Sequence, residues 1–252
     1  DSTKAPPSPS AGASSNTRSD NPTMPARSQP VTPISQTTPS TCGDSAQEPV
    51  RRLSAFEYVR ALNALVGVQV DEGTLPPTSA DTIFTTEERA LGSSALLVDG
   101  QFAAAEAAGR TVLATLESDG AAAYTGCDTS TPACIDEFIT RFAQKAFRRP
   151  ASSGEHTRLR MLYDQVVPNE GIHVALASIV QAIVLSPRFG FHVEERIASG
   201  TLDGWSIAAR LSFFLWASSP DDELMALAAS NQLSDPAVRE AQARRMLTDK
   251  RA

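Results

Sequence analysis

Chemistry-bearing motifs are scarce in this sequence, and aromatic residues make up only 6% of its 252 residues. It has no glycine-rich phosphate loop and no nucleophile-elbow pattern around a serine. Its three histidines are not spaced to meet on one helix face, as a helical metal site would need. We therefore predict no catalytic residue and no metal site, and a non-enzymatic role is the favoured interpretation for this span.

A net positive charge and long hydrophobic runs are also lacking. The chain has 22 Lys and Arg against 29 Asp and Glu, a formal net charge of −7, so we expect no nucleic-acid partner. The longest apolar stretch, residues 172–185, contains His173 and Gln181 and is shorter than the roughly 20 residues that cross a bilayer. We therefore expect no transmembrane segment within this span.

Residues 1–49 differ in composition from the rest. They contain 26 Ser, Thr or Pro residues and no aromatic residue, which predicts a disordered tether. Such tethers commonly follow an export signal or a lipid-modified cysteine, so a lipid anchor upstream is expected; a linker between two domains is the alternative. Because the chain starts without Met and its last predicted helix stops at Ala252 without a capping glycine, we expect a piece of a longer protein.

From residue 50 onward the informative signals are helical. Ser54 with Glu57, and Ser152 with Glu155, have the spacing of capping boxes ahead of apolar residues at helical intervals. Residues 171–185 are apolar nearly all round, which predicts the central helix. The predicted fold class is therefore mainly α: a multi-helix, orthogonal or bundle-like body of seven to nine helices after the disordered tail.

Some predictions concern particular boundaries and faces. We expect Pro168 to end the helix that starts after Ser152, and a short helix to run from Ser186 through Glu195. We expect a helix that starts near Ser94 to be interrupted at Gly100 and Gly109. The residues of this helix that we expect to face the core are Leu96, Phe102, Ala105, Val112 and Leu116.

Five stretches carry a resemblance to known families. Residues 51–67, RRLSAFEYVRALNALVG, and residues 81–109 resemble the two halves of the third planctomycete surface domain family. Residues 133–150, ACIDEFITRFAQKAFRRP, and residues 179–195 are similar to the opening and the end of the fifth family. The stretch from residue 208 onward, AARLSFFLWASSPDDELMALA, resembles the start of the fourth family.

This resemblance implies a division into modules and a cellular context. It divides the body into residues 50–117, 118–200 and 201–252, like the third, the fifth and the start of the fourth family. Related chains are exported or lipid-anchored and continue into C-terminal cytochrome-like regions with a Cys-x-x-Cys-His haem motif, which this span lacks. We therefore expect a periplasmic or cell-surface location, no cofactor in this span, and a c-type haem in a C-terminal region that serves as its partner, with cell-envelope proteins as further partners.

The favoured function is a non-catalytic helical scaffold or docking module of an exported, tethered, haem-associated protein. Two alternatives stay open. The module could form part of the active site of an extracytoplasmic haem redox enzyme, or the protein could be a structural or adhesion protein of the cell surface.

The cysteines offer one test of the compartment. Cys127 and Cys134 flank a short Thr/Ser/Pro turn, and a disulfide between them is the favoured interpretation, with two unpaired thiols as the alternative. A disulfide presupposes an oxidising compartment. A metal site is poorly supported because no histidine lies nearby in the sequence. Cys42 is left over, as a free thiol or with a partner outside this chain.

Three further residues are candidates for contact with a haem or an anion. For His192 an ordinary hydrogen-bonded histidine is the favoured interpretation, and the alternative is a haem-proximal or acid/base group if another domain packs on it. Arg148 and Arg149 close a predicted helix, at the end that favours cations. Structural contacts to carboxylates and carbonyls are the favoured interpretation; the alternative is binding of an anion such as a haem propionate, because Arg binds carboxylates bidentately.

Overall fold

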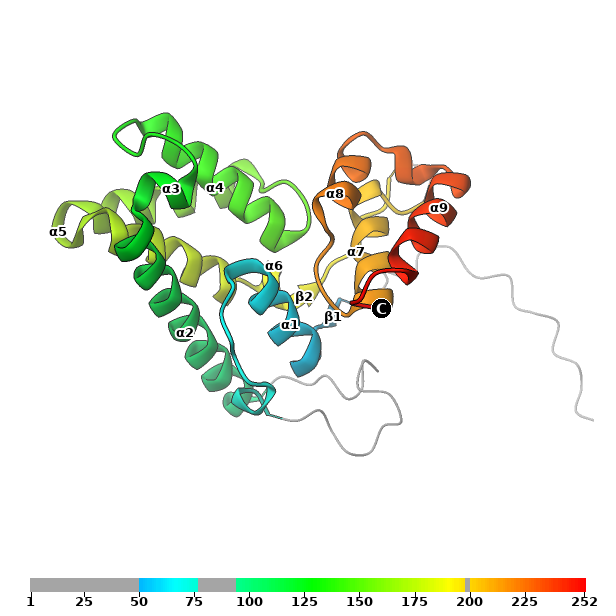
Figure 1. The fold of residues 1–252 in the computed structure, drawn as a ribbon, viewed down its shortest axis with the longest axis horizontal. Coiled ribbons are helices and arrows are strands. Elements are labelled where there is room, and N and C mark those ends of the chain that lie inside the picture. The colour runs from blue at the N-terminus through cyan, green and yellow to red at the C-terminus, as the bar shows by residue number, and fades with distance from the viewer. Residues whose placement is uncertain (1–49, 77–93, 198–199) are drawn as a thin grey trace, which may run out of the picture. The chain divides into compact units, whose positions relative to one another are not determined.

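The computed structural model describes residues 50–76, 94–197 and 200–252 (Figure 1). Within these ranges it has nine α-helices and very little strand, which confirms the predicted class and helix number. The tether predicted for residues 1–49 and Cys42 lie outside the described residues. The helices are α1 (Ala55–Val66), α2 (Ala95–Asp119), α3 (Ala121–Thr125), α4 (Pro132–Phe147), α5 (Ser153–Leu185), α6 (Pro187–Gly190), α7 (Gly204–Trp216), α8 (Asp222–Ala229) and α9 (Pro236–Leu247), with 3-10 turns η1 (Glu72–Thr74) and η3 (Gln232–Ser234).

Side-chain caps set most of the helix starts. Both predicted capping boxes are present, at Ser54 with Glu57 and at Ser152 with Glu155. Gly67 ends α1 in the left-handed conformation that glycine adopts at low cost, with φ of 73°. At six further helices a polar side chain accepts a hydrogen bond from the first turn, at Ser94, Thr131, Ser186, Asp203, Asp221 and Asp235.

The predicted break between the helix after Ser152 and the helix of residues 171–185 is present, but the prediction that it falls at Pro168 is wrong. The helix continues past Pro168 as α5, and it is interrupted at Gly171, whose φ of 80° and ψ of 173° are not helical. Glycine reaches positive φ without the steric cost that a Cβ imposes. Pro168 removes one backbone donor close to this break, where the regular hydrogen-bond ladder is ending.

The predicted core face of α2 is also partly wrong. Leu96 and Phe102 are 65% and 53% exposed, and Gly100 and Gly109 do not interrupt the helix. A Cβ at Gly100 would clash with the carbonyl oxygen of Thr74, and one at Gly109 would clash with the side chain of Gln181 on α5. The glycines therefore permit close packing. The buried face consists of Leu97, Gly100, Ala104, Ala105, Ala108, Gly109, Val112 and Leu116.

Two hydrophobic cores form within residues 50–252. The first is shared by α1, α2, α4, α5 and α6, so the modules predicted at 50–117 and 118–200 pack as one body. The second core belongs to α7, α8, η3 and α9. Phe213 of α7 is buried in the first core, which links the two.

A two-stranded pairing joins the start and the end of the first body. The predicted helix from Ser186 to Glu195 is wrong beyond Gly190: α6 ends there, and β2 (Phe191–His192) pairs antiparallel with β1 (Arg51–Arg52). The Leu53 N–H adds a bond to the Gly190 carbonyl at 2.8 Å. Pairing with β1 gives the backbone groups of the extended β2 segment the hydrogen-bond partners that a helix would otherwise supply.

One helix among the described residues, spanning Ser153–Val184, is long and apolar enough to cross a membrane by length and composition alone. This is weak evidence for a membrane span, because the core helix of a soluble protein passes the same test. In α5, Leu176, Ile179 and Ile183 are fully buried in the first core. The expectation that this span has no transmembrane segment stays a prediction.

Candidate functional site

The fold brings together the three residues singled out as haem or anion contacts. Arg148, Arg149 and His192 all line one small pocket of about 20 Å³, beside the end of α4 and the strand β2. A cavity of this size has room for about one water molecule. The site is therefore a packed junction at which helix ends meet.

Arg148 anchors the segment from α6 to β2. It caps α4 with a left-handed φ of 61° and is only 4% exposed. Its Nη1 donates to the Phe189 carbonyl at 3.1 Å, and its Nη2 donates to the carbonyls of Arg188 and Phe191 at 2.9 Å each. Burial lowers the pKa of Arg148 to about 10, an effect that the charge of Glu57 opposes, so the group is cationic at neutral pH.

Arg51, Ser54 and Glu57 form the first of two equivalent structures, which we call the buried cap. The Glu57 carboxylate accepts two bonds from the Arg51 guanidinium, at 2.8 and 3.0 Å, and one from the Ser54 N–H at 2.9 Å. The Ser54 hydroxyl accepts from the Glu57 N–H at 3.2 Å. Ser54 is 1% exposed and Glu57 3% exposed. The capping box of α1 is thus combined with a bidentate ion pair whose carboxylate is buried and whose guanidinium is 25% exposed.

Arg149, Ser152 and Glu155 repeat this structure at the start of α5, and we call them the open cap. Glu155 accepts two bonds from Arg149, at 2.9 and 3.1 Å, and one from the Ser152 N–H at 2.7 Å. Ser152 is exposed. Sequence reasoning found both capping boxes and expected structural contacts for the arginines, but it did not pair each arginine with the cap glutamate, which the spacing Arg-x-x-Ser-x-x-Glu at both places could have revealed.

The open cap has further charged neighbours. Arg188 approaches Glu155 at 3.4 Å, and Glu195 approaches Arg149 at 3.7 Å. The hydrogen bonds from Arg149 are the main reason that the pKa of Glu155 falls to about 2. Glu155 therefore stays ionised and paired across the physiological pH range.

His192 of β2 contacts Phe213, the α7 residue that is buried in the first core. Its ring packs edge-on against Phe213, with centroids 4.3 Å apart, and its backbone pairs with Arg51. Nε2 is buried and has no hydrogen-bond partner within the described chain, so the hydrogen-bonded interpretation fails for this atom. Burial, with the charges of Arg148 and Arg51, lowers the pKa of His192 to about 2, and the ring is neutral. Its haem-proximal role, like anion binding by Arg148 and Arg149, stays a prediction.

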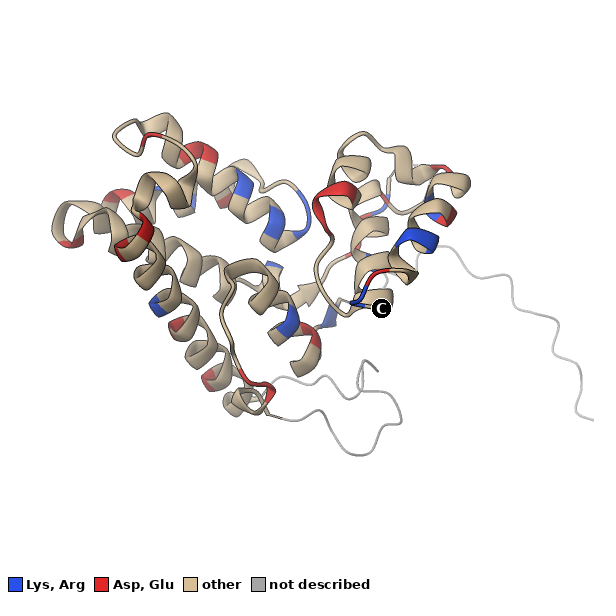
Figure 2. Ribbon diagram, in the orientation of Figure 1, with Lys and Arg blue, Asp and Glu red and all other residues tan. Residues whose placement is uncertain are grey.

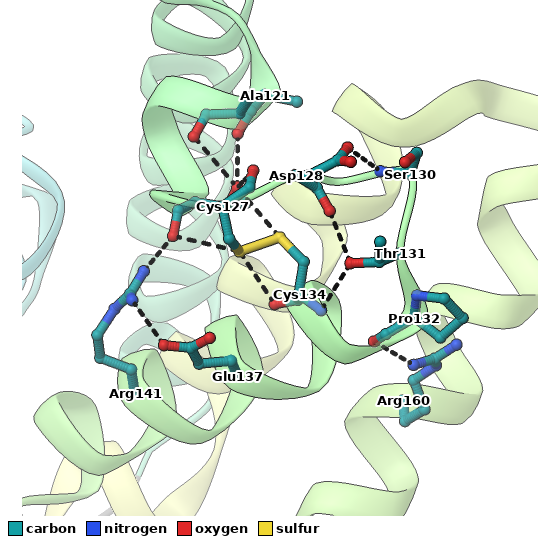
Figure 3. The surroundings of a disulfide bond; sticks show 12 residues. Ala121, Cys127, Asp128, Ser130, Thr131, Pro132, Cys134, Glu137, Arg141 and Arg160 are labelled. Carbon is teal, nitrogen blue, oxygen red and sulfur yellow. Dashed lines mark hydrogen bonds and ion pairs between the residues drawn. A yellow bond between two sulfur atoms is a disulfide. The ribbon is translucent and has the colours of Figure 1, made fainter.

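The predicted disulfide between Cys127 and Cys134 is confirmed, with a Cα–Cα distance of 5.6 Å (Figure 3). It closes the turn between α3 and α4. Thr125 is fully buried beside it and donates from its hydroxyl to the Ala121 carbonyl at 2.8 Å. Arg141 donates to the Thr125 carbonyl. The disulfide thus belongs to a hydrogen-bonded structural turn.

Charge is spread over several helices of the described chain, with acidic and basic residues interspersed (Figure 2). No group of three or more His, Cys, Asp or Glu side chains within the described ranges is placed to hold a metal ion. The acidic pair Asp221 and Asp222 starts α8, where Asp221 caps the helix and accepts from Arg245 at 2.8 Å. The charged groups described so far are thus engaged in structural contacts.

The fold and the junction define an all-α chain in which two modules share one core and a third has its own. Family models match these modules in the same order. Residues 51–114 match PSD3, residues 134–194 match PSD5 and residues 202–252 match PSD4, described as proteins of unknown function (DUF1587, DUF1595 and DUF1592). The chain thus carries PSD3, PSD5 and PSD4 segments, which confirms the resemblance seen in the sequence. The comparisons with curated proteins and with solved structures gave no match.

Proposed function

We propose that this chain is a non-catalytic helical scaffold of an exported, tethered protein, and that it holds a c-type haem region elsewhere in the same protein. The observation that carries the scaffold role is the way Arg148 and the two caps hold backbone segments. Arg148 binds three backbone carbonyls, and the two caps pair their arginines with the carboxylates that cap α1 and α5. These charged groups hold backbone segments in place, as a rigid support requires.

The disulfide between Cys127 and Cys134 supports export, because disulfides persist in oxidising compartments. We propose a location in the periplasm or on the cell surface, with residues 1–49 as a tether to a lipid anchor. Mass spectrometry of nonreduced peptides from the natural protein tests this placement. Alkylatable thiols at both positions in material from the cell envelope would contradict it.

The haem association rests on the resemblance to exported chains with cytochrome-like regions. This chain's own residues do not fit covalent haem attachment, since it has no Cys-x-x-Cys-His sequence and two of its three cysteines are joined to each other. The haem therefore belongs to another region of the protein. A haem-stained gel and a visible spectrum of the full-length natural protein, beside this 252-residue chain, form the test. Haem in the full-length protein alone is the expected result, and no haem in either contradicts the association.

A second candidate function is a part in the active site of a haem redox enzyme. It is favoured by the convergence of Arg148, Arg149 and His192 on one pocket. His192→Gln in the full-length protein separates the two functions. A scaffold predicts an unchanged haem spectrum and reduction potential, whereas an active-site role predicts a shift in either while the helical content stays the same.

A further inference from the structure

A wider pocket opens beside the open cap. Its volume is about 440 Å³, within the roughly 300 to 1,000 Å³ of small-ligand sites. Trp205, next to the first residue of α7, lines the pocket and also packs on the second core, which holds its ring in place. The charged residues that line the pocket are Arg149, Glu155, Arg188, Glu195 and Asp203.

These charges are unequally paired. Glu155 is 12% exposed and binds Arg149 at 2.9 Å, with Arg188 at 3.4 Å. Glu195 is 55% exposed, and its guanidinium neighbour Arg149 is 3.7 Å away, beyond hydrogen-bonding distance. Glu195 thus presents an accessible carboxylate that the folded chain pairs only loosely.

Asp203 adds a second acidic group next to Trp205. Its Oδ1 accepts from the Ser206 N–H at 2.7 Å as the cap of α7. Three carboxylates therefore face two guanidinium groups in this pocket, which leaves it net negative. An aromatic face beside carboxylates attracts cations through both its quadrupole and their charge.

We propose that this pocket binds a cationic side chain, an arginine or a lysine of a protein partner, against the ring of Trp205 and the carboxylates of Glu195 and Asp203. A carboxylate ligand is disfavoured. It would find the exposed guanidinium of Arg188, but it would also meet the three acidic groups of the pocket. The site does not depend on the haem association, so the two proposals fail separately.

The test is a titration of the 252-residue chain with N-acetyl-arginine amide and N-acetyl-lysine amide, followed by NMR of the two tryptophan indole N–H signals. Trp205→Phe assigns the signals. We expect a saturable shift of the Trp205 signal and a Kd that rises with salt concentration. Glu195→Gln should weaken binding about tenfold, because it removes a charged partner of the ligand.

Glu240→Gln is the matched control. Glu240 is an exposed carboxylate on α9 that pairs with Arg244 at 2.7 Å and does not line the pocket. This variant should bind like the original chain. The salt dependence of the original chain keeps the test independent of how well Glu195→Gln folds.

Three results would overturn the proposal. One is the absence of a saturable Trp205 shift with either cationic probe. Another is an unchanged Kd in a folded Glu195→Gln variant. The third is tighter binding of N-acetyl-glutamate amide that depends on Arg188, which would make the pocket a carboxylate site.

Discussion

The buried cap and the open cap have the same sequence spacing and matching hydrogen bonds but different surroundings. In both, the glutamate accepts two bonds from the arginine and one from the cap N–H. Glu57 is 3% exposed, whereas Glu155 is 12% exposed beside an open pocket. The motif therefore determines the local geometry, and we expect burial to determine how much each cap contributes to stability.

The residues before each cap explain the difference. Leu53, directly before Ser54, is 1% exposed and donates to the Gly190 carbonyl, so α1 begins beside β2. Ala151, at the equivalent position before Ser152, is only partly buried.

The largest expected effect comes from removing the carboxylate charge of each cap. Glu57→Gln should lower the free energy of unfolding by about 3 to 5 kcal/mol, because it removes a buried carboxylate and leaves the part-buried Arg51 and the buried Arg148 without their counter-charge. Glu155→Gln should cost less, about 1 to 2 kcal/mol, because the Glu155 carboxylate is 12% exposed and lines a pocket. Urea denaturation of both variants measures the difference. Equal losses would mean that burial does not separate the caps.

Loss of the disulfide provides a reference that shares no partner with either cap. Cys127→Ser combined with Cys134→Ser should lower the free energy of unfolding by about 2 to 2.5 kcal/mol, by the chain-entropy model for so short a loop. The difference between the Glu57 and Glu155 variants should persist in this background, because independent sites add. Its disappearance would mean that the caps are coupled to the α3–α4 turn.

Acid should lower the free energy of unfolding through His192 and through Glu155 in different pH windows. The folded-state pKa of His192, about 2, is below its ordinary value of 6.5, so as the pH falls below 6.5 the unfolded chain binds a proton that the folded chain does not. Stability should fall by up to about 1.4 kcal/mol per pH unit from this group. His192→Gln should reduce that slope, as unfolding measurements between neutral and mildly acidic pH would detect.

Glu155 contributes in a more acidic window. Its folded-state pKa of about 2 is below the ordinary 4.5, so its stabilisation is present above pH 4.5 and is lost as the pH falls towards 2. Glu155→Gln should leave the slope above pH 5 unchanged. A slope above pH 5 that followed Glu155 and not His192 would contradict the assignment.

The smallest effects are expected from the cap hydroxyls. Ser54→Ala should cost about 1 to 2 kcal/mol, because the Glu57 N–H loses its acceptor away from water. Ser152→Ala should cost about 0.5 to 1 kcal/mol, because water can replace the exposed hydroxyl. Thermal unfolding of the two variants compares them directly. A larger loss of stability in Ser152→Ala than in Ser54→Ala would contradict the expectation that the more buried hydroxyl contributes more.

Local signals in the sequence determined the helical class, most helix starts, both capping boxes and the disulfide. Each depends on residues a few positions apart, as with Ser54 and Glu57 or Cys127 and Cys134. The face of α2 was harder to predict, because its leucines and phenylalanine carry the hydrophobicity while small residues carry the close contact with α5. Periodicity alone does not distinguish these two uses of a helix face.

Only the tertiary structure decided what surrounds these local elements. Residues 51 and 192 pair as strands although 141 positions separate them, and this pairing accompanies the end of α6 at Gly190 and the bond from the Leu53 N–H to the Gly190 carbonyl. Hydrogen bonds within a cap are local, and so the sequence determines them. Burial and the electrostatic field at a side chain depend on whatever packs against it from distant parts of the chain, and that is settled only when the two modules form their shared core.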